Sequence, residues 1–152
     1  MLILDNLRSA ENVGAIFRTA DAAGVSKIFL TGYTPAPRDR FDRPVAKIAK
    51  AALGAEEFVP WESRSDAATL IKELRAQGYQ IVALEQAPNS VDYSIISADQ
   101  PLGVIVGNEV EGVSSELLAA SDLVAEIPMG GRKESLNVSV AMGIFLYRHG
   151  GR

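Results

Sequence analysis

Short apolar runs alternate with helix-like patterns along the whole chain. The apolar runs predict strands at 2–4, 27–30, 58–59, 79–84, 102–106 and 123–127. Helices are predicted at about 9–23, 45–53 and 65–77, just after Ser114, and at about 136–148, where capping side chains or glycines mark several of the ends. Strands separated by helices predict an α/β fold with a mainly parallel sheet and helices on both faces.

The last predicted helix differs from the others because apolar residues surround it almost completely. These residues are Leu136, Val138, Val140, Ala141, Met142, Ile144, Phe145, Leu146 and Tyr147. A helix that is apolar all round is buried on more than one side. Two explanations fit this pattern: a core helix that its own chain covers well, or a helix at the interface of a homodimer.

The composition indicates an ordinary globular chain. Its 152 residues are 47% hydrophobic and 22% charged, which predicts a single domain over 1–152. The apolar runs are too short to span a membrane, and no signal-peptide pattern is present. The absence of cysteine excludes disulfides, thiolate nucleophiles and Cys-based zinc sites. The only histidine, His149, is expected at a solvated helix end and cannot build a metal site alone. We therefore expect a cytoplasmic protein without a metal or membrane partner.

The charge is uneven along the chain. The net charge of −4 argues mildly against a nucleic-acid partner, because phosphate binding requires cations. Between 38 and 50, however, five cations stand against two aspartates, and five minus two gives +3. The cations of this basic segment are Arg38, Arg40, Arg43, Lys47 and Lys50. The segment is a candidate contact for an RNA backbone, and the alternative is a solvated loop and helix face.

The first candidate motif is Asn-x-Gly-x-x-x-Arg-Thr-Ala-Asp over 12–21. Asn12 and Arg18 are six positions apart on one predicted helix, so they need not share a face. Gly14 costs about 1 kcal/mol relative to alanine inside a helix. The close approach of another backbone or of a ligand would explain it. From the residues alone, Arg18 is interpreted as an ordinary surface arginine.

The second motif, Gly-Asn-Glu-x-x-Gly over 107–112, follows the apolar strand 102–106. Its polar side chains therefore lie at the carboxyl end of a strand, the edge where open α/β sheets bind ligands. No Lys-Ser/Thr pair follows the glycines, so nucleoside triphosphate binding is not supported. A plain acidic turn is the alternative.

The third motif runs from Ile127 to 141 and reads Pro-Met-x-Gly-x-x-x-Ser-Leu-Asn-Val-Ser-Val-Ala from Pro128. Proline stops the preceding strand, and the glycines allow backbone angles that other residues resist. Ser135 and Asn137 stand where the last helix begins, and helix N-termini favour anions. These residues predict a turn whose backbone can hold a small polar ligand.

In this order, the three motifs resemble the signatures of the SpoU (TrmH-type) branch of the SPOUT RNA methyltransferases, over nearly the whole chain. The resemblance implies a deep C-terminal trefoil knot (SPOUT-type) and favours the homodimer through the C-terminal helix. It also implies transfer of a methyl group from S-adenosylmethionine to a ribose 2′-hydroxyl in tRNA or rRNA.

The resemblance also implies which residues form the site. The cofactor would contact Leu84, Gly107, Asn108, Glu109, Ile127, Met129, Ser135, Leu136 and Asn137. The reaction site would contain Asn12, Arg18, Glu109, Ser135 and Asn137. We expect RNA contacts from Arg8 and Arg18 and from the basic segment.

The chemistry of guanidinium refines the role of Arg18. A guanidinium does not give up its proton in proteins, so it is a poor general base. We expect Arg18 to hold a phosphate and to stabilise the developing oxyanion, while Glu109 or the RNA phosphate accepts the proton. The alternatives are a non-catalytic module that binds an adenosine ligand or RNA, and a small-molecule methyltransferase. A module without turnover would lose a reaction-site residue, whereas all five are present.

Overall fold

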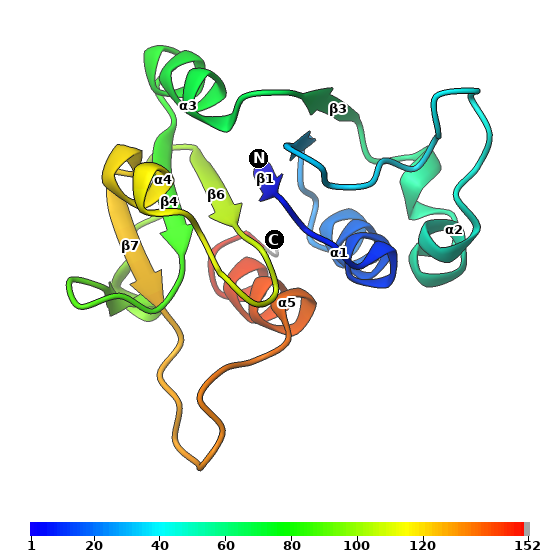
Figure 1. The fold of residues 1–152 in the computed structure, drawn as a ribbon. Coiled ribbons are helices and arrows are strands. Elements are labelled where there is room, and N and C mark those ends of the chain that lie inside the picture. The colour runs from blue at the N-terminus through cyan, green and yellow to red at the C-terminus, as the bar shows by residue number, and fades with distance from the viewer. Residues whose placement is uncertain (151–152) are drawn as a thin grey trace.

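The computed structural model describes residues 1–150, which contain a seven-stranded sheet (Figure 1). The strands are β1 (Leu2–Asp5), β2 (Ile28–Thr31), β3 (Trp61–Arg64), β4 (Gln80–Leu84), β5 (Val91–Asp92), β6 (Leu102–Val106) and β7 (Leu123–Glu126). Their order across the sheet is β3-β2-β1-β6-β4-β7-β5, and neighbouring strands pair in parallel. The predicted parallel α/β sheet is confirmed.

Helices cover both faces of this sheet, as predicted (Figure 1). The helices are α1 (Ala10–Ala22), α2 (Ala46–Ala52), α3 (Ala67–Ala76), α4 (Ser115–Ala120) and α5 (Val138–His149), with short 3-10 turns at Ala55–Glu57 and Tyr93–Ile95. Successive strand residues point to opposite faces. Leu2 and Leu4 therefore pack with α1, α2 and α5, whereas Ile3 packs with α3 and α4.

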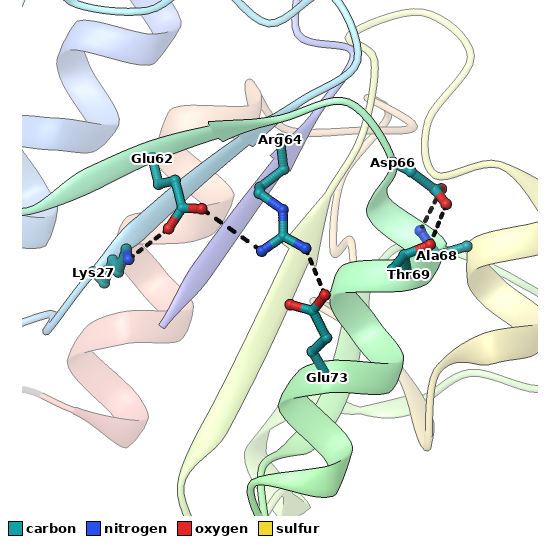
Figure 2. A network of polar contacts seen from close by, with 7 residues as sticks. All are labelled: Lys27, Glu62, Arg64, Asp66, Ala68, Thr69 and Glu73. Atoms are coloured by element: carbon teal, nitrogen blue, oxygen red, sulfur yellow. Dashed lines mark hydrogen bonds and ion pairs between the residues drawn. The ribbon is translucent and has the colours of Figure 1, made fainter.

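The third strand is the main difference from the sequence prediction. Phe58 is 76% exposed and lies outside the sheet, so the strand predicted at 58–59 is wrong. The edge strand β3 begins at Trp61 and carries charged side chains instead of an apolar run. Glu62 pairs with Lys27 at 2.7 Å, and Arg64 pairs with Glu73 at 2.7 Å, as Figure 2 shows. Polar contacts of this kind suit an edge strand, which hydrophobic patterning does not detect.

Gly14 has a structural explanation in the packing of α1 against α2. A Cβ atom on Gly14 would lie 2.5 Å from the carbonyl oxygen of Ile48 and 2.7 Å from Cβ of Ala51. The expectation of a close backbone approach is therefore confirmed. The approaching group is a neighbouring helix rather than a ligand.

The helix α5 begins at Val138, two residues later than predicted, because Asn137 caps it. The Asn137 side chain accepts the Ser139 N–H at 2.9 Å. Met142, Phe145 and Leu146 are buried against the sheet and α1, whereas Val140, Ile144 and Tyr147 are exposed. The chain therefore covers only part of this apolar helix.

His149 lies at the end of α5, as expected, but its side chain is less solvated than expected. Its ring is half-buried, lies 4.5 Å from the Phe145 ring and has Nε2 2.9 Å from the carbonyl oxygen of Tyr93.

Between residues 1 and 150, no helix is long and apolar enough to cross a membrane.

Candidate functional site

A cavity of about 720 Å³ lies at the carboxyl ends of the central strands. Its walls are the ends of β4, β6 and β7 with the segments that follow them, namely parts of 84–86, 106–113 and 126–138, together with residues of α1, α4 and α5. The long connection between β7 and α5 extends beyond the sheet at this end (Figure 1). This edge is where open parallel sheets bind ligands, so the cavity is the candidate site.

The predicted cofactor residues all line this cavity. They are Leu84, Gly107, Asn108, Glu109, Ile127, Met129, Ser135, Leu136 and Asn137. Four of the five predicted reaction-site residues, Asn12, Glu109, Ser135 and Asn137, line it as well. The fold thus brings together parts of three motifs that are far apart in the sequence.

Glu109 binds the start of α1 through several hydrogen bonds. Its carboxylate accepts the N–H of Arg8 at 2.9 Å, the N–H of Ser9 at 2.9 Å and Nδ2 of Asn12 at 3.2 Å. Burial by itself would raise the pKa of Glu109, but these donors outweigh burial and hold the pKa below its ordinary value. A carboxylate held in this way is a weaker proton acceptor.

The amide groups of Asn12 and Asn137 continue this network. Nδ2 of Asn137 donates to Oδ1 of Asn12 at 3.1 Å, while Nδ2 of Asn12 donates to Glu109. Oδ1 of Asn137 accepts the N–H and the hydroxyl of Ser139. Both asparagines are therefore fixed in orientation at the wall of the cavity.

Asn108 has a structural role that the sequence did not indicate. Its Oδ1 accepts the N–H groups of Val110 and Glu111, both at 2.9 Å. Its Nδ2 donates to the carbonyl of Asn6 at 3.1 Å and to the Tyr33 hydroxyl at 2.9 Å. The side chain is saturated by the protein, so a ligand could reach only its backbone.

Two residues after β4 were missed by sequence reasoning. Glu85 accepts the N–H of Val113 at 3.0 Å, and Gln86 donates to the carbonyl of Glu134 at 2.8 Å. They link the segment after β4 to the loops of the second and third motifs. The available signal was their position directly after a buried strand.

The cavity lining is strongly acidic. Glu85, Glu109, Glu111, Glu126 and Glu134 line it, whereas no lysine or arginine between residues 1 and 150 does so. Opposite charges attract more strongly in a partly desolvated site than in bulk water. The lining therefore favours a ligand that carries positive charge.

Arg18 lies apart from this cavity. It is exposed on α1 and does not line the cavity. The six positions from Asn12 to Arg18 correspond to about 9 Å along a helix and about 240° around it. A single chain therefore does not place Arg18 with the other predicted reaction-site residues.

The predicted RNA contacts are also partly engaged within the chain. Arg38 pairs with Glu57 at 3.2 Å, Arg43 with Asp39 at 2.9 Å, and Lys47 approaches Glu11 at 3.9 Å. Arg40 and Lys50 form no ion pair within residues 1–150. Arg40 instead lies over the exposed Phe41 ring, 4.7 Å from its centre. These ion pairs reduce the local excess of positive charge.

Comparison with known proteins agrees with this arrangement. The model of the SpoU rRNA Methylase family matches residues 1–147. A protein assigned to the TrmH family of tRNA/rRNA methyltransferases, from Staphylococcus saprophyticus, is 38% identical over 147 residues, which are 97% of this chain and 56% of that protein. The chain thus spans about half the length of the curated relatives that it matches.

Solved structures give the same result. An S-adenosylmethionine-bound rRNA methyltransferase from Sinorhizobium meliloti is 36% identical with a TM-score of 0.87, over 97% of this chain and 54% of that one. A TrmH/SpoU tRNA-modifying enzyme from A. aeolicus is 32% identical with a TM-score of 0.84, over 97% of this chain and 72% of that one. The chain belongs to the SpoU rRNA methylase family.

Proposed function

We propose that this chain methylates RNA, transferring the methyl group of S-adenosylmethionine to a ribose 2′-hydroxyl in tRNA or rRNA. The observation that carries the proposal is the single cavity lined by parts of all three motifs. The relatives named above support the cofactor and the class of substrate. We expect the whole chain to act as one catalytic domain in the cytoplasm.

The residues of the cavity fit this cofactor. S-adenosylmethionine supplies an electrophilic methyl group on a positively charged sulfonium, a charge that the acidic lining complements. The backbone of the second and third motif loops would hold the cofactor, with Leu84, Ile127 and Leu136 as apolar contacts. The trefoil knot remains a prediction from the resemblance.

The reaction also requires removal of a proton from a weakly acidic hydroxyl. Of the two expected proton acceptors, Glu109 is already engaged, because its carboxylate accepts hydrogen bonds from the start of α1 that also lower its pKa. An RNA phosphate is not held in this way, so we favour it as the acceptor because of its access to the hydroxyl and not because of its basicity. Asn12 and Asn137 orient the reaction site, and Arg18 would hold the phosphate and stabilise the oxyanion.

A homodimer would bring Arg18 to the cavity. Val140, Ile144 and Tyr147 form an exposed apolar stripe on α5, and Leu136, just before the helix, is also exposed and lines the cavity. Burial of this stripe against a second copy would place the dimer interface at the mouth of the site. Arg18 of the second copy, which is exposed on α1, would then complete the reaction site.

Nucleoside analysis tests the proposed function. The protein is incubated with labelled S-adenosylmethionine and total tRNA and rRNA, and the RNA is digested to nucleosides. A 2′-O-methylated nucleoside supports the proposal, and a labelled base or the absence of labelled RNA contradicts it.

Arg18→Ala tests the assigned role of the arginine. It should reduce single-turnover methylation at least about a hundredfold, the effect typical of losing an oxyanion-stabilising group, with cofactor affinity changed only a few-fold. Arg75→Ala, which removes a surface arginine of α3, is the matched control and should have little effect. Near-normal turnover of Arg18→Ala would contradict the assignment.

A further inference from the structure

A second cavity adjoins the candidate site, which we call the cofactor cavity, and has a different set of lining residues. Its volume is about 540 Å³, and it is lined by Arg8, Tyr33, Pro35, Asn108, Val110 and Glu111. Asn108, Val110 and Glu111 line both cavities. The second motif loop is therefore a wall common to the two.

Tyr33 presents a fixed aromatic ring to this second cavity. Its hydroxyl accepts Nδ2 of Asn108 at 2.9 Å, and its backbone N–H donates to Oδ1 of Asn6 at 3.2 Å. The residue is nevertheless 59% exposed, and Val110 on the shared wall is 81% exposed. A ring held at both ends loses little conformational freedom when a flat ligand stacks on it.

Arg8 adds a cation beside the ring. Its backbone N–H donates to the Glu109 carboxylate, so the backbone of Arg8 lies at the edge of the reaction site. Its side chain is exposed and forms no ion pair within the described residues 1–150. The cavity thus combines an aromatic platform, an apolar wall and an available guanidinium, which together match a nucleotide.

We propose that this second cavity receives the base of the nucleotide to be methylated, stacked on Tyr33, with Arg8 at its phosphate. The inference rests on the proposed function. A ribose joins its base to its phosphate, so a 2′-hydroxyl near Glu109 leaves both groups within reach of the shared wall. A base can enter such a cavity only if it leaves its helical stack, as bases in single-stranded RNA loops do. The substrate class is therefore an unpaired nucleotide.

Substitutions at Tyr33 test the proposal. Stacking on an aromatic side chain contributes about 1–3 kcal/mol per base, so Tyr33→Ala should weaken binding of nucleoside 5′-monophosphates about 5- to 150-fold. Tyr33→Phe keeps the ring and loses only the contact with Asn108, so its affinity should stay within about threefold. Phe58→Ala, which removes an exposed aromatic ring outside both cavities, is the matched control.

Binding is followed by NMR titration with each of the four monophosphates, and cofactor affinity is measured separately. All variants should bind S-adenosylmethionine within about twofold of the original chain. Monophosphate binding that depends on Tyr33 supports the base site even if no RNA is methylated, so this result is distinct from failure of the proposed function. Two results would overturn the inference. The first is a Tyr33→Ala variant that equals Phe58→Ala in both monophosphate binding and RNA methylation. The second is an original chain that binds no monophosphate.

Discussion

The side chains of Asn12 and Asn137 are joined by a hydrogen bond of 3.1 Å across 125 positions of sequence. Asn12 lies in the first turn of α1, and Asn137 caps α5. Because Asn12 also binds Glu109, this bond makes the three motifs one connected network at the cavity. The network links the start of α1, the loop after β6 and the start of α5.

The two functions of Asn137 can be separated by substitution. Asn137→Asp keeps the oxygen that caps α5 but removes the Nδ2 donor to Asn12, so stability should change little while cofactor affinity falls about 2- to 10-fold. Asn137→Ala loses the cap as well and should reduce the free energy of unfolding by about 1 kcal/mol. Urea unfolding and calorimetric binding measure the two effects. Equal stability losses in both variants would contradict the division.

Gly14 should tolerate no side chain. Alanine normally stabilises a helix by about 1 kcal/mol relative to glycine, but a Cβ here would meet the backbone of Ile48 at 2.5 Å. We expect Gly14→Ala to reduce the free energy of unfolding by about 1–3 kcal/mol. Gly143→Ala is the control, because its Cβ would meet only Cγ2 of Thr19, at an ordinary 3.6 Å. The control should be neutral or stabilising, and urea unfolding compares the two.

A charge in the apolar stripe tests the proposed dimer. Ile144 is 36% exposed on α5, and Ile144→Asp would place a carboxylate within the proposed interface. We expect sedimentation to change from dimer to monomer and methylation to be lost with it. Leu53→Asp, at the exposed apolar residue that follows α2, is the control and should leave the oligomeric state unchanged. A monomeric original chain would contradict the interface.

The burial of His149 predicts a pH dependence of stability. Burial is the main cause of its lowered pKa, which the contact with the Tyr93 carbonyl partly opposes. The imidazole of the unfolded chain is protonated with its ordinary pKa of about 6.5, whereas the imidazole of the folded chain is protonated only at lower pH. The free energy of unfolding therefore decreases as the pH falls from about 6.5 through the lower pKa of the folded state. The contribution is fully present above that range.

The measurement is the free energy of unfolding from about pH 8 to about pH 5. His149→Gln removes the titrating group, so its stability should decline less over this interval than that of the original chain. Protonation of carboxylates whose pKa is lowered, such as Glu109, also destabilises the folded protein, but mainly at lower pH. These carboxylates are present in both proteins, so they do not affect the comparison. Parallel curves for the two proteins would show that His149 does not contribute.

The alternation of apolar runs and helical patterns determined the parallel sheet with helices on both faces, because burial of such segments depends mainly on local periodicity. The same pattern could not identify β3, a charged edge strand whose partners Lys27 and Glu73 come from other elements. The motifs named most of the cavity lining, since residues at the carboxyl ends of parallel strands meet at one edge.

Only the tertiary structure decided how those residues are used. In the folded chain the Asn108 side chain makes all its hydrogen bonds within the protein, and the pKa of Glu109 is lowered. Gly14 lies where two helices pack closely together. These outcomes depend on distances between atoms of remote segments and on the solvent left around each group, and neither quantity is encoded in local spacing along the chain.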